Sequence, residues 1–280
     1  MVDTAVAAAS YARGIVPQRL RAPHRRPDQI ERSDLVERMI GCRAPIVVVR
    51  AGAGYGKSTL LSQVVAADPR PAGWLTVDPA DDDPVVLLRH LVGALGDAGL
   101  DVDEVVAALA GPTPKLSRHA LPLLAEVAAG PVSPFLLVLD DLHVVSRDES
   151  VDFADELLRL LPADCTVVLA GRSMPDMRLA RWEVDGLVAR FDESDLAYTD
   201  AEARQVLAAA LPELSQRLER EVMRVTAGWP AGLHLAILAL RDHPDPPVVI
   251  DGLLASDRRV VDYLQQEGLA RLDPDLRQFL

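Results

Sequence analysis

The sequence predicts an α/β fold, a parallel sheet with helices on both faces, followed by a small all-helical region. Up to Phe191, short apolar runs of strand length alternate with segments of helical period, which is typical of parallel sheets built from strand–helix–strand units. After Phe191 only helical patterns follow. We therefore expect two structural parts, for which a chain of 280 residues is long enough.

The strands and helices of the first part are expected to alternate. The predicted strands cover residues 46–49, 74–77, 135–139, 166–170 and 187–191. The predicted helices cover residues 57–67, 84–98, 118–129, 150–161 and 177–182. Runs as apolar as these indicate strands that are buried on both faces of the sheet.

The second part opens on a helix-start signal. Thr199 and Glu202 form a T-x-x-E capping box ahead of the helical pattern of residues 203–210. Further helices are predicted at residues 213–226, 231–241, 247–255 and 258–269. The expected domains are a leader (1–30), an α/β domain (31–195), a helical domain (196–245) and the start of another domain (246–280) that continues past Leu280.

Composition argues against two classes of protein. The longest apolar stretch, residues 228–240, is shorter than the roughly 20 residues of a membrane span, so we expect a cytoplasmic protein with no membrane partner. The net charge of −13 argues against general binding to nucleic acid. The arginines between Arg19 and Arg32 are either a local basic patch or a solvated lead-in segment, and the acids among them favour the second reading.

A glycine-rich turn follows the first predicted strand, where Ala51–Thr59 reads AGAGYGKST. Such a turn between a strand and a helix aims backbone N–H groups at one point, and the helix N-terminus adds positive potential, so it holds phosphates. Lys57 would reach the β- and γ-phosphates and Ser58 would ligate Mg²⁺, so the motif predicts bound ATP or ADP with Mg²⁺. The expected nucleotide-binding residues of the loop are Gly52, Ala53, Gly54, Tyr55, Gly56, Lys57, Ser58 and Thr59.

Two details of the chain bear on this motif. Of the 29 lysine and arginine residues only Lys57 and Lys115 are lysine, so a lysine at the motif position is informative. The usual pattern G-x-x-x-x-G-K-[ST] has glycine at position 51, where this chain has alanine, and we expect its small size to suffice. A glycine-rich turn without a ligand is the alternative.

A second component of a phosphate site is an apolar strand that ends in acid, and residues 135–139 run into Asp140 and Asp141. We expect Asp140 to hold Mg²⁺, mostly through water, and Asp141 to orient or deprotonate the attacking water. Alone, this run could equally be a strand followed by a turn. The phosphate loop makes the functional interpretation the better one.

Two further polar residues follow predicted strands. His143 either contacts the γ-phosphate or is merely exposed or packed. Arg172 follows the strand 166–170, so it would emerge at the carboxyl edge of the sheet, where ligands of open α/β sheets bind. It is therefore a candidate sensor of the γ-phosphate, with a surface ion pair to Asp176 as the alternative.

With these pieces in order, the chain resembles the signal-transduction ATPases with numerous domains (STAND), and in particular the MalT-like, LuxR-type large ATP-binding regulators. The resemblance covers residues 20–280. It is carried by Arg32–Leu35 and by the segments AGAGYGKSTLL, AGWLTVDPADDDP, LLVLDDLHVV, AGRSMPDMRLARW, DLAYTDAEA and AGWPAGLHLA.

The resemblance implies a P-loop NTPase fold and a regulatory role. It implies that Trp229 and Pro230 close over the adenine, although helix capping alone would also explain the proline, and that Arg32 borders the base or ribose. It identifies residues 246–280 as the start of a winged-helix domain. It further implies an ADP-bound resting state, self-association in the ATP state, slow hydrolysis as a reset, and regions outside this chain that bind inducer and DNA.

Two other classes compete with this interpretation. A metabolic P-loop kinase would need an acceptor pocket and a lid, and the helical region has no arginine-rich lid motif. An AAA-type motor would use Arg172 or Arg178 on a neighbouring subunit, and its acidic pair is usually aspartate–glutamate rather than Asp140–Asp141.

Overall fold

The computed structural model describes residues 15–25, 29–110 and 114–241, and these divide into two compact units. The sheet unit contains the described residues up to Ala51 together with Lys57–Asp192. The helical unit contains the described residues from Glu193 on. It also includes Gly52–Gly56, the centre of the glycine-rich turn.

The sheet unit is built on five parallel strands: β1 (Ile46–Arg50), β2 (Ala72–Thr76), β3 (Leu136–Asp140), β4 (Thr166–Gly171) and β5 (Val188–Asp192). Their order is β2-β3-β4-β1-β5, so β1 lies between β4 and β5. The predicted parallel sheet is confirmed, and each predicted strand agrees with the observed one to within two residues at either end.

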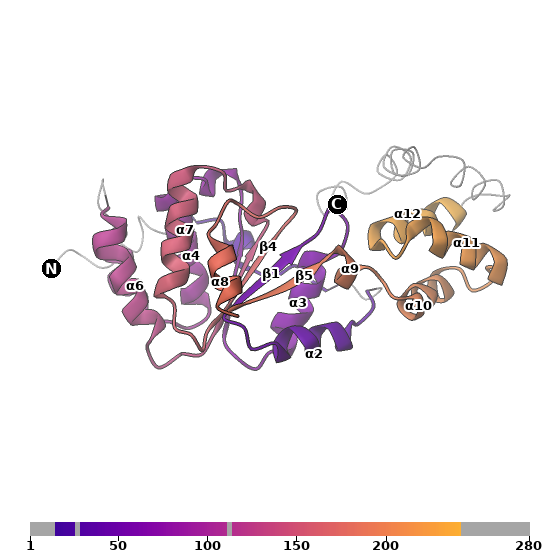
Figure 1. Cartoon of the computed structure of the whole chain (residues 1–280), viewed down its shortest axis with the longest axis horizontal. Coiled ribbons are helices and arrows are strands. Elements are labelled where there is room, and N and C mark those ends of the chain that lie inside the picture. The colour runs from indigo at the N-terminus through magenta and orange to yellow at the C-terminus, as the bar shows by residue number, and fades with distance from the viewer. Residues whose placement is uncertain (1–14, 26–28, 111–113, 242–280) are drawn as a thin grey trace. The chain divides into compact units, whose positions relative to one another are not determined.

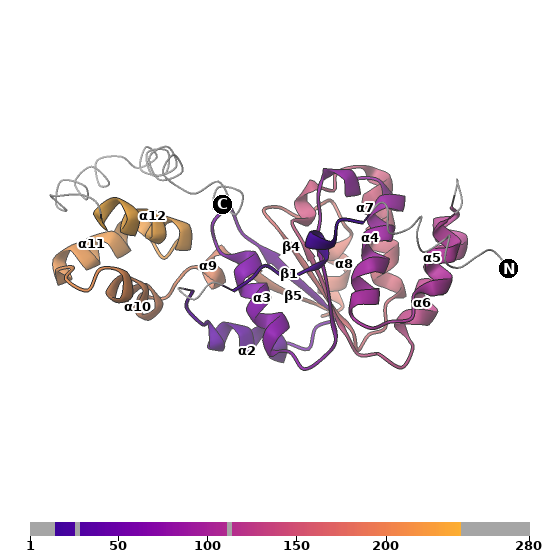
Figure 2. The same ribbon diagram turned by 180° about the vertical axis from the view of Figure 1, so that it is seen from behind.

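Helices lie on both faces of this sheet (Figures 1 and 2). One face carries α2 (Ser33–Gly41) and α3 (Lys57–Ala67), and the other carries α4 (Pro84–Asp97), α6 (Leu121–Ala128) and α7 (Asp148–Leu160). The pleat explains this arrangement, because successive side chains of a strand point to opposite faces. Ile46 and Val48 of β1 pack into the core formed with α4, α6 and α7, whereas Val47 and Val49 alternate with them and are equally buried.

Among the described α-helices of the sheet unit, α2 and α5 (Asp103–Leu109) were not predicted. Both begin without a side-chain cap, but so do α6, α7 and α8, which were predicted, so the missing cap alone does not explain the difference. The helix predicted at residues 118–129 is α6 preceded by a π-helical turn, Leu116–Ala120. The helix predicted at residues 177–182 is α8 (Leu179–Val184), shifted by two residues.

The helical unit contains α9 (Glu193–Leu196), α10 (Asp200–Ala210), α11 (Gln216–Thr226) and α12 (Pro230–Arg241). The predicted capping box is present, since Thr199 Oγ1 accepts from the Glu202 amide and the Glu202 carboxylate accepts from the Thr199 amide. Apolar side chains of α10, α11 and α12 form its core, including Leu207, Val222 and Leu233. The helices predicted at residues 247–255 and 258–269, and the winged-helix segment, lie outside the described residues.

The carboxyl ends of the inner strands meet at one edge of the sheet. Arg50 at the end of β1 pairs with Gly171 at the end of β4, and Asp140 at the end of β3 pairs with Thr76 of β2. The polar residues that follow β1, β3 and β4 therefore share this edge. None of the described helices has the length and apolar character needed to cross a membrane.

Candidate functional site

Lys57 lies at the first turn of α3, directly after the glycine-rich turn. Its side chain is buried, with 7% of the residue exposed, and its Nζ donates a hydrogen bond to the Ala51 carbonyl at 2.9 Å. Ala51 is itself 1% exposed, and its amide donates to the Gly171 carbonyl at 3.2 Å. The methyl group at position 51 is thus accommodated inside the sheet unit, and the lysine is held beside the end of β1.

Ser58 and Asp140 bring two oxygen atoms together. The Ser58 hydroxyl donates to Asp140 Oδ2 at 2.5 Å, which joins the first turn of α3 to the end of β3. Asp140 is 2% exposed, and burial raises its pKa to about 6, with the negative charge of Asp141 acting in the same direction. The Ser58 hydroxyl and the positive charge of Lys57 oppose this rise.

The chain turns sharply after β3, because Asp141 has a φ of 58° in the left-handed region. The Asp141 amide donates to Asp140 Oδ1 at 3.0 Å, so the turn also holds the buried carboxylate. The Asp141 side chain is 43% exposed, which leaves its carboxylate accessible to water. The two aspartates therefore have different environments, one buried and hydrogen-bonded and the other largely open.

His143 lies in the short 3-10 turn Leu142–Val144 that follows. Its Nδ1 is 3.7 Å from Asp141 Oδ1, too far for a hydrogen bond, and it has no hydrogen-bond partner among the described residues. Burial lowers the pKa of His143; Asp141 acts against this, and Arg172 and Lys57 act with it. These four side chains of the sheet unit are therefore close enough to influence one another.

Arg172 follows β4, and it is exposed. Within the described part of the chain it forms no ion pair with Asp176. Its neighbour Gly171 was not predicted as a site residue, yet a Cβ there would lie 2.8 Å from the Ser173 carbonyl and 3.1 Å from the His143 amide. Only glycine allows the backbones to approach this closely. Gly171 therefore helps to fix the backbone positions of Arg172, which follows it, and of His143, which lies against it.

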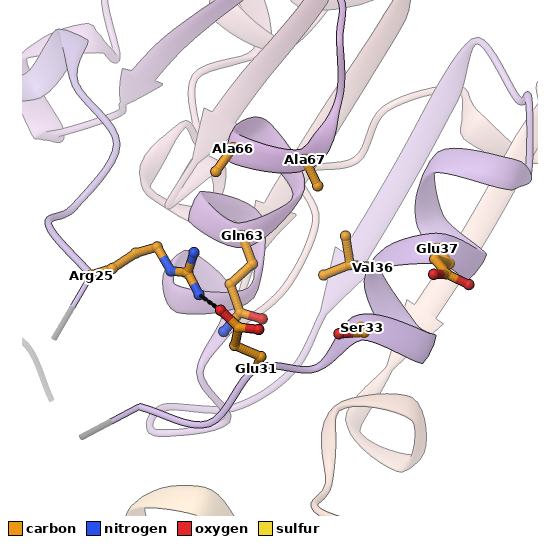
Figure 3. A pocket seen from close by; sticks show the side chains of 8 residues that line it. All are labelled: Arg25, Glu31, Ser33, Val36, Glu37, Gln63, Ala66 and Ala67. Atoms are coloured by element: carbon orange, nitrogen blue, oxygen red, sulfur yellow. Dashed lines mark hydrogen bonds and ion pairs between the residues drawn. The ribbon is translucent and has the colours of Figure 1, made fainter. Parts of the chain in front are cut away.

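Arg32 is held at the start of α2 by a side chain that sequence reasoning missed. Gln63 of α3 accepts from the Arg32 amide at 2.9 Å and donates to the Ile30 carbonyl at 3.0 Å. Figure 3 shows Gln63 pointing toward the segment that carries Glu31, in an open cavity of about 230 Å³. The sequence did contain a signal for this role, because Gln63 is a polar residue that lies between Leu60 and Val64 on the buried side of the predicted helix.

The centre of the glycine-rich turn is described with the helical unit. Gly54 and Gly56 both have a φ of 75°, a conformation that glycine adopts without strain. The Gly52 amide donates to Glu193 Oε1 of α9 at 2.8 Å. Burial and Glu193 together raise the pKa of Tyr55. Glu193, which carries no motif signal in the sequence, is therefore a partner of the loop.

Trp229 and Ala231 hold the same loop by its carbonyl groups. Trp229 Nε1 donates to the Ala53 carbonyl at 3.0 Å, and the Ala231 amide donates to the Gly54 carbonyl at 3.0 Å. Pro230 is the first residue of α12, a position whose N–H would have no partner within the helix, so proline costs no hydrogen bond there. Gly228, with a φ of 76°, accepts from the Tyr198 amide at 2.7 Å, which fixes the turn before Trp229.

The predicted residues thus fall into two groups. The sheet unit brings six of them to one edge of the sheet: Lys57, Ser58, Asp140, Asp141, His143 and Arg172. Thr59 lies on the same turn of α3 as Ser58. The Arg32 amide is bound by Gln63 of α3. The helical unit holds Gly52, Ala53, Gly54, Tyr55 and Gly56 with Trp229 and Pro230. A buried amine, an oxygen pair and a glycine-rich turn are the groups that bind phosphate and a hard cation.

Comparison with known proteins agrees with this architecture. No family model matches the sequence. The HTH-type transcriptional regulator MalT of Cronobacter sakazakii is 31% identical over 278 residues, which is 95% of this chain and 30% of that protein. MalT of Yersinia enterocolitica is 28% identical over 275 residues, again 95% of this chain and 30% of that protein. The chain therefore spans less than a third of the length of these relatives.

Solved structures show the same fold at low sequence identity. A STAND protein with a tetratricopeptide repeat sensor from Pyrococcus horikoshii matches 90% of this chain and 34% of its own, with a TM-score of 0.60 and 14% identity. A Walker-type ATPase of Pyrococcus abyssi matches 91% of this chain and 80% of its own, with a TM-score of 0.53 and 13% identity. Over nearly its whole length the chain is homologous to part of the MalT transcriptional regulators, and it shares its fold with these two ATPase structures.

Proposed function

We propose that this chain is the nucleotide-binding switch module of a MalT-like, LuxR-type transcriptional regulator, which binds ADP or ATP with Mg²⁺ and hydrolyses ATP slowly. The observation that carries the proposal is the buried Lys57 of α3, whose amine bonds the Ala51 carbonyl just after β1, together with the oxygen pair of Ser58 and Asp140. A buried cation next to a glycine-rich turn is a site for an anion, and the oxygen pair suits a hard divalent cation.

In this proposal the glycine-rich turn and Lys57 bind the phosphates. The Lys57 ammonium hydrogen-bonds a neutral backbone carbonyl, Ala51 O, and phosphate oxygens are stronger acceptors for a charged donor. When nucleotide binds, the Lys57 ammonium would exchange the Ala51 carbonyl for oxygen atoms of the β- and γ-phosphates. Gly52–Gly56 and the first turn of α3, including Thr59, would supply the backbone N–H groups, with the Gly52 amide exchanging Glu193 Oε1 for phosphate.

Ser58 and Asp140 fit Mg²⁺. Both offer oxygen atoms, the ligand type that Mg²⁺ prefers, and Mg²⁺ commonly takes its remaining ligands from phosphates and water. A bound divalent cation would neutralise charge on the phosphates. The buried Asp140 carboxylate, whose pKa lies at about 6, is a group whose ionised form a cation would favour.

The remaining residues have roles that follow from their exposure and charge. Asp141, with an accessible carboxylate, would orient or deprotonate the attacking water, and His143 would lie beside it. Arg172 is exposed at the carboxyl edge and would sense the γ-phosphate. Arg32 would border the base or ribose, and Pro230 would close over the adenine.

In the proposed cycle ADP holds a resting monomer, and exchange for ATP favours a second state that self-associates. A switch of this kind needs different nucleotide affinities in the two states. Inducer and DNA would be bound by regions outside this chain. The proposed domains are residues 31–195 for the α/β part and residues 196–245 for the helical part, followed by a winged-helix segment.

The nucleotide retained through purification tests the proposal. The protein is purified without added nucleotide and denatured, and the released nucleotide is identified by chromatography. We expect ADP at close to one per chain, together with slow turnover of added ATP. Rapid turnover to ADP with a small phosphate acceptor would favour a kinase, and a stable ATP-dependent hexamer would favour a motor. Either outcome contradicts the switch.

A further inference from the structure

Two hydrogen bonds from Trp229 and Ala231, at the start of α12, hold the glycine-rich turn. The side chain of Trp229 and the amide of Ala231 bind two successive carbonyl groups of the turn, those of Ala53 and Gly54. Each bond measures 3.0 Å, and both lie within the helical unit. Neither involves a charged group, so this contact fixes backbone orientation rather than adding charge to the turn.

Close packing accompanies these bonds. A Cβ at Gly54 would lie 2.4 Å from the Ala231 Cβ and 3.0 Å from Trp229 Nε1. A Cβ at Gly232 would lie 2.3 Å from Trp229 Cε3. The indole therefore packs against two positions where only glycine fits, one in the turn and one in α12, and its place is sterically determined.

The planarity of the peptide bond gives this contact a consequence for phosphate binding. In a trans peptide the C=O of one residue and the N–H of the next point in opposite directions. The bond to the Ala53 carbonyl therefore orients the Gly54 amide, and the bond to the Gly54 carbonyl orients the Tyr55 amide. Both N–H groups are turned away from α12.

We infer that Trp229 is a positioning residue for the phosphate chain of the nucleotide, and acts by aiming the Gly54 amide rather than by touching the base. This inference rests on the proposed function of the turn as the phosphate site. It assigns the indole N–H a task that does not depend on which base the nucleotide carries.

Substitution Trp229→Phe tests the inference, because it keeps an aromatic ring beside Gly232 and removes the N–H donor. The affinities of ADP and of inorganic pyrophosphate, each with Mg²⁺, are measured by calorimetry for the wild type and the variant. A single hydrogen bond predicts a loss of about threefold to tenfold. We expect that loss for both ligands, since pyrophosphate has phosphates but no base.

Trp74→Phe is the matched control. Trp74 Nε1 donates to Thr76 Oγ1 at 2.9 Å in β2, so this variant also loses an indole hydrogen bond, but in the sheet unit. It should bind both ligands as the wild type does. The number of sites per chain in each titration gives the folded fraction, so that affinities are compared for folded molecules.

Two outcomes would overturn the inference. If Trp229→Phe weakens ADP and leaves pyrophosphate unchanged, Trp229 acts on the base or ribose. If neither affinity changes, the bond to Ala53 does not position the turn. Failure of the proposed function looks different, because the wild type itself would then bind neither ligand.

Discussion

The hydroxyl of Ser58 donates a 2.5 Å hydrogen bond to Asp140, and this bond links the first turn of α3 to the end of β3. This bond is the largest of the interactions that stabilise the ionised form of Asp140. Burial, which leaves the residue only 2% exposed, and the negative charge of Asp141 both destabilise that form. The protein therefore maintains a buried carboxylate under unfavourable conditions at the carboxyl edge of its sheet. Such a group destabilises the nucleotide-free fold and becomes useful when a cation is bound.

The first prediction concerns the pH dependence of stability. Asp140 has a pKa of about 6 in the folded protein against 3.8 as its ordinary value, so between these pH values the folded chain holds a proton that the unfolded chain has released. The free energy of unfolding should thus fall as pH rises through this window, by at most about 3 kcal/mol, and then level off. Urea unfolding of nucleotide-free, magnesium-free protein measures this fall.

Asp140→Asn is the comparison for this measurement. The amide carries no charge at any pH, so the variant should lack this part of the pH dependence and be the more stable protein at pH 7. The difference between the two proteins removes the contribution of other titrating groups. A difference that does not vary between pH 4 and pH 7 would show that Asp140 is not a carboxylate of raised pKa.

The second prediction concerns Arg172. If its guanidinium contacts the γ-phosphate, Arg172→Ala should weaken ATP by about tenfold and leave ADP unchanged, since ADP has no γ-phosphate. Arg181→Ala, at another exposed arginine of the sheet unit, should change neither affinity. Calorimetry with ADP and a non-hydrolysable ATP analogue measures both. Equal weakening of the two nucleotides by Arg172→Ala would remove it as a γ-phosphate sensor.

The third prediction concerns Gly54. An added Cβ would lie 2.4 Å from the Ala231 Cβ, and the φ of 75° is unfavourable for alanine, so Gly54→Ala should weaken ADP by at least about tenfold. Adding Ala231→Gly relieves the contact but not the φ, so the double variant should recover part of the affinity. Calorimetry on the four proteins of this cycle separates the two causes. If the double variant binds no better than Gly54→Ala, packing against α12 is not what limits this position.

The fourth prediction concerns Gln63. Its side chain bonds the Arg32 amide and the Ile30 carbonyl, and Gln63→Leu leaves both backbone groups without these partners. The free energy of unfolding should fall by about 1 to 3 kcal/mol. Gln63→Glu keeps an acceptor for the Arg32 amide, so its loss in urea unfolding should be smaller. A loss for the glutamate variant as large as that for leucine would mean that the Arg32 bond contributes little.

Most of the fold was predictable because four strands, β1 to β4, are largely buried on both faces, although β5 is only partly buried. Short apolar runs such as Phe135–Leu139 are typical of buried strands, and helix α3 begins at Lys57 as the motif requires. Helices α2 and α5 were not predicted from the sequence. The buried Leu35, Val36 and Met39 of α2 have the spacing of an amphipathic helix, so the local pattern did carry a signal for this helix.

The candidate site was predictable where a motif fixes residue type and spacing. Lys57, Ser58 and Asp140 follow from the glycine-rich turn and the acidic strand end. Gly171, Gln63 and Glu193 were missed because each acts through backbone groups brought close by folding, and a hydrogen bond to a main-chain atom leaves no spacing in the sequence. The hydrogen bond from Trp229 to Ala53 joins residues 176 positions apart and was not foreseen.

The most direct test of the account is the affinity for ADP with Mg²⁺ of three proteins, the wild type, Lys57→Ala and Lys115→Ala, measured by calorimetry on nucleotide-stripped samples. The chain has only these two lysines, and Lys115 is exposed, which makes it a matched control. The account predicts a loss of about tenfold to a hundredfold for Lys57→Ala and none for Lys115→Ala. Wild-type affinity in Lys57→Ala would contradict the assignment of this turn as a phosphate site.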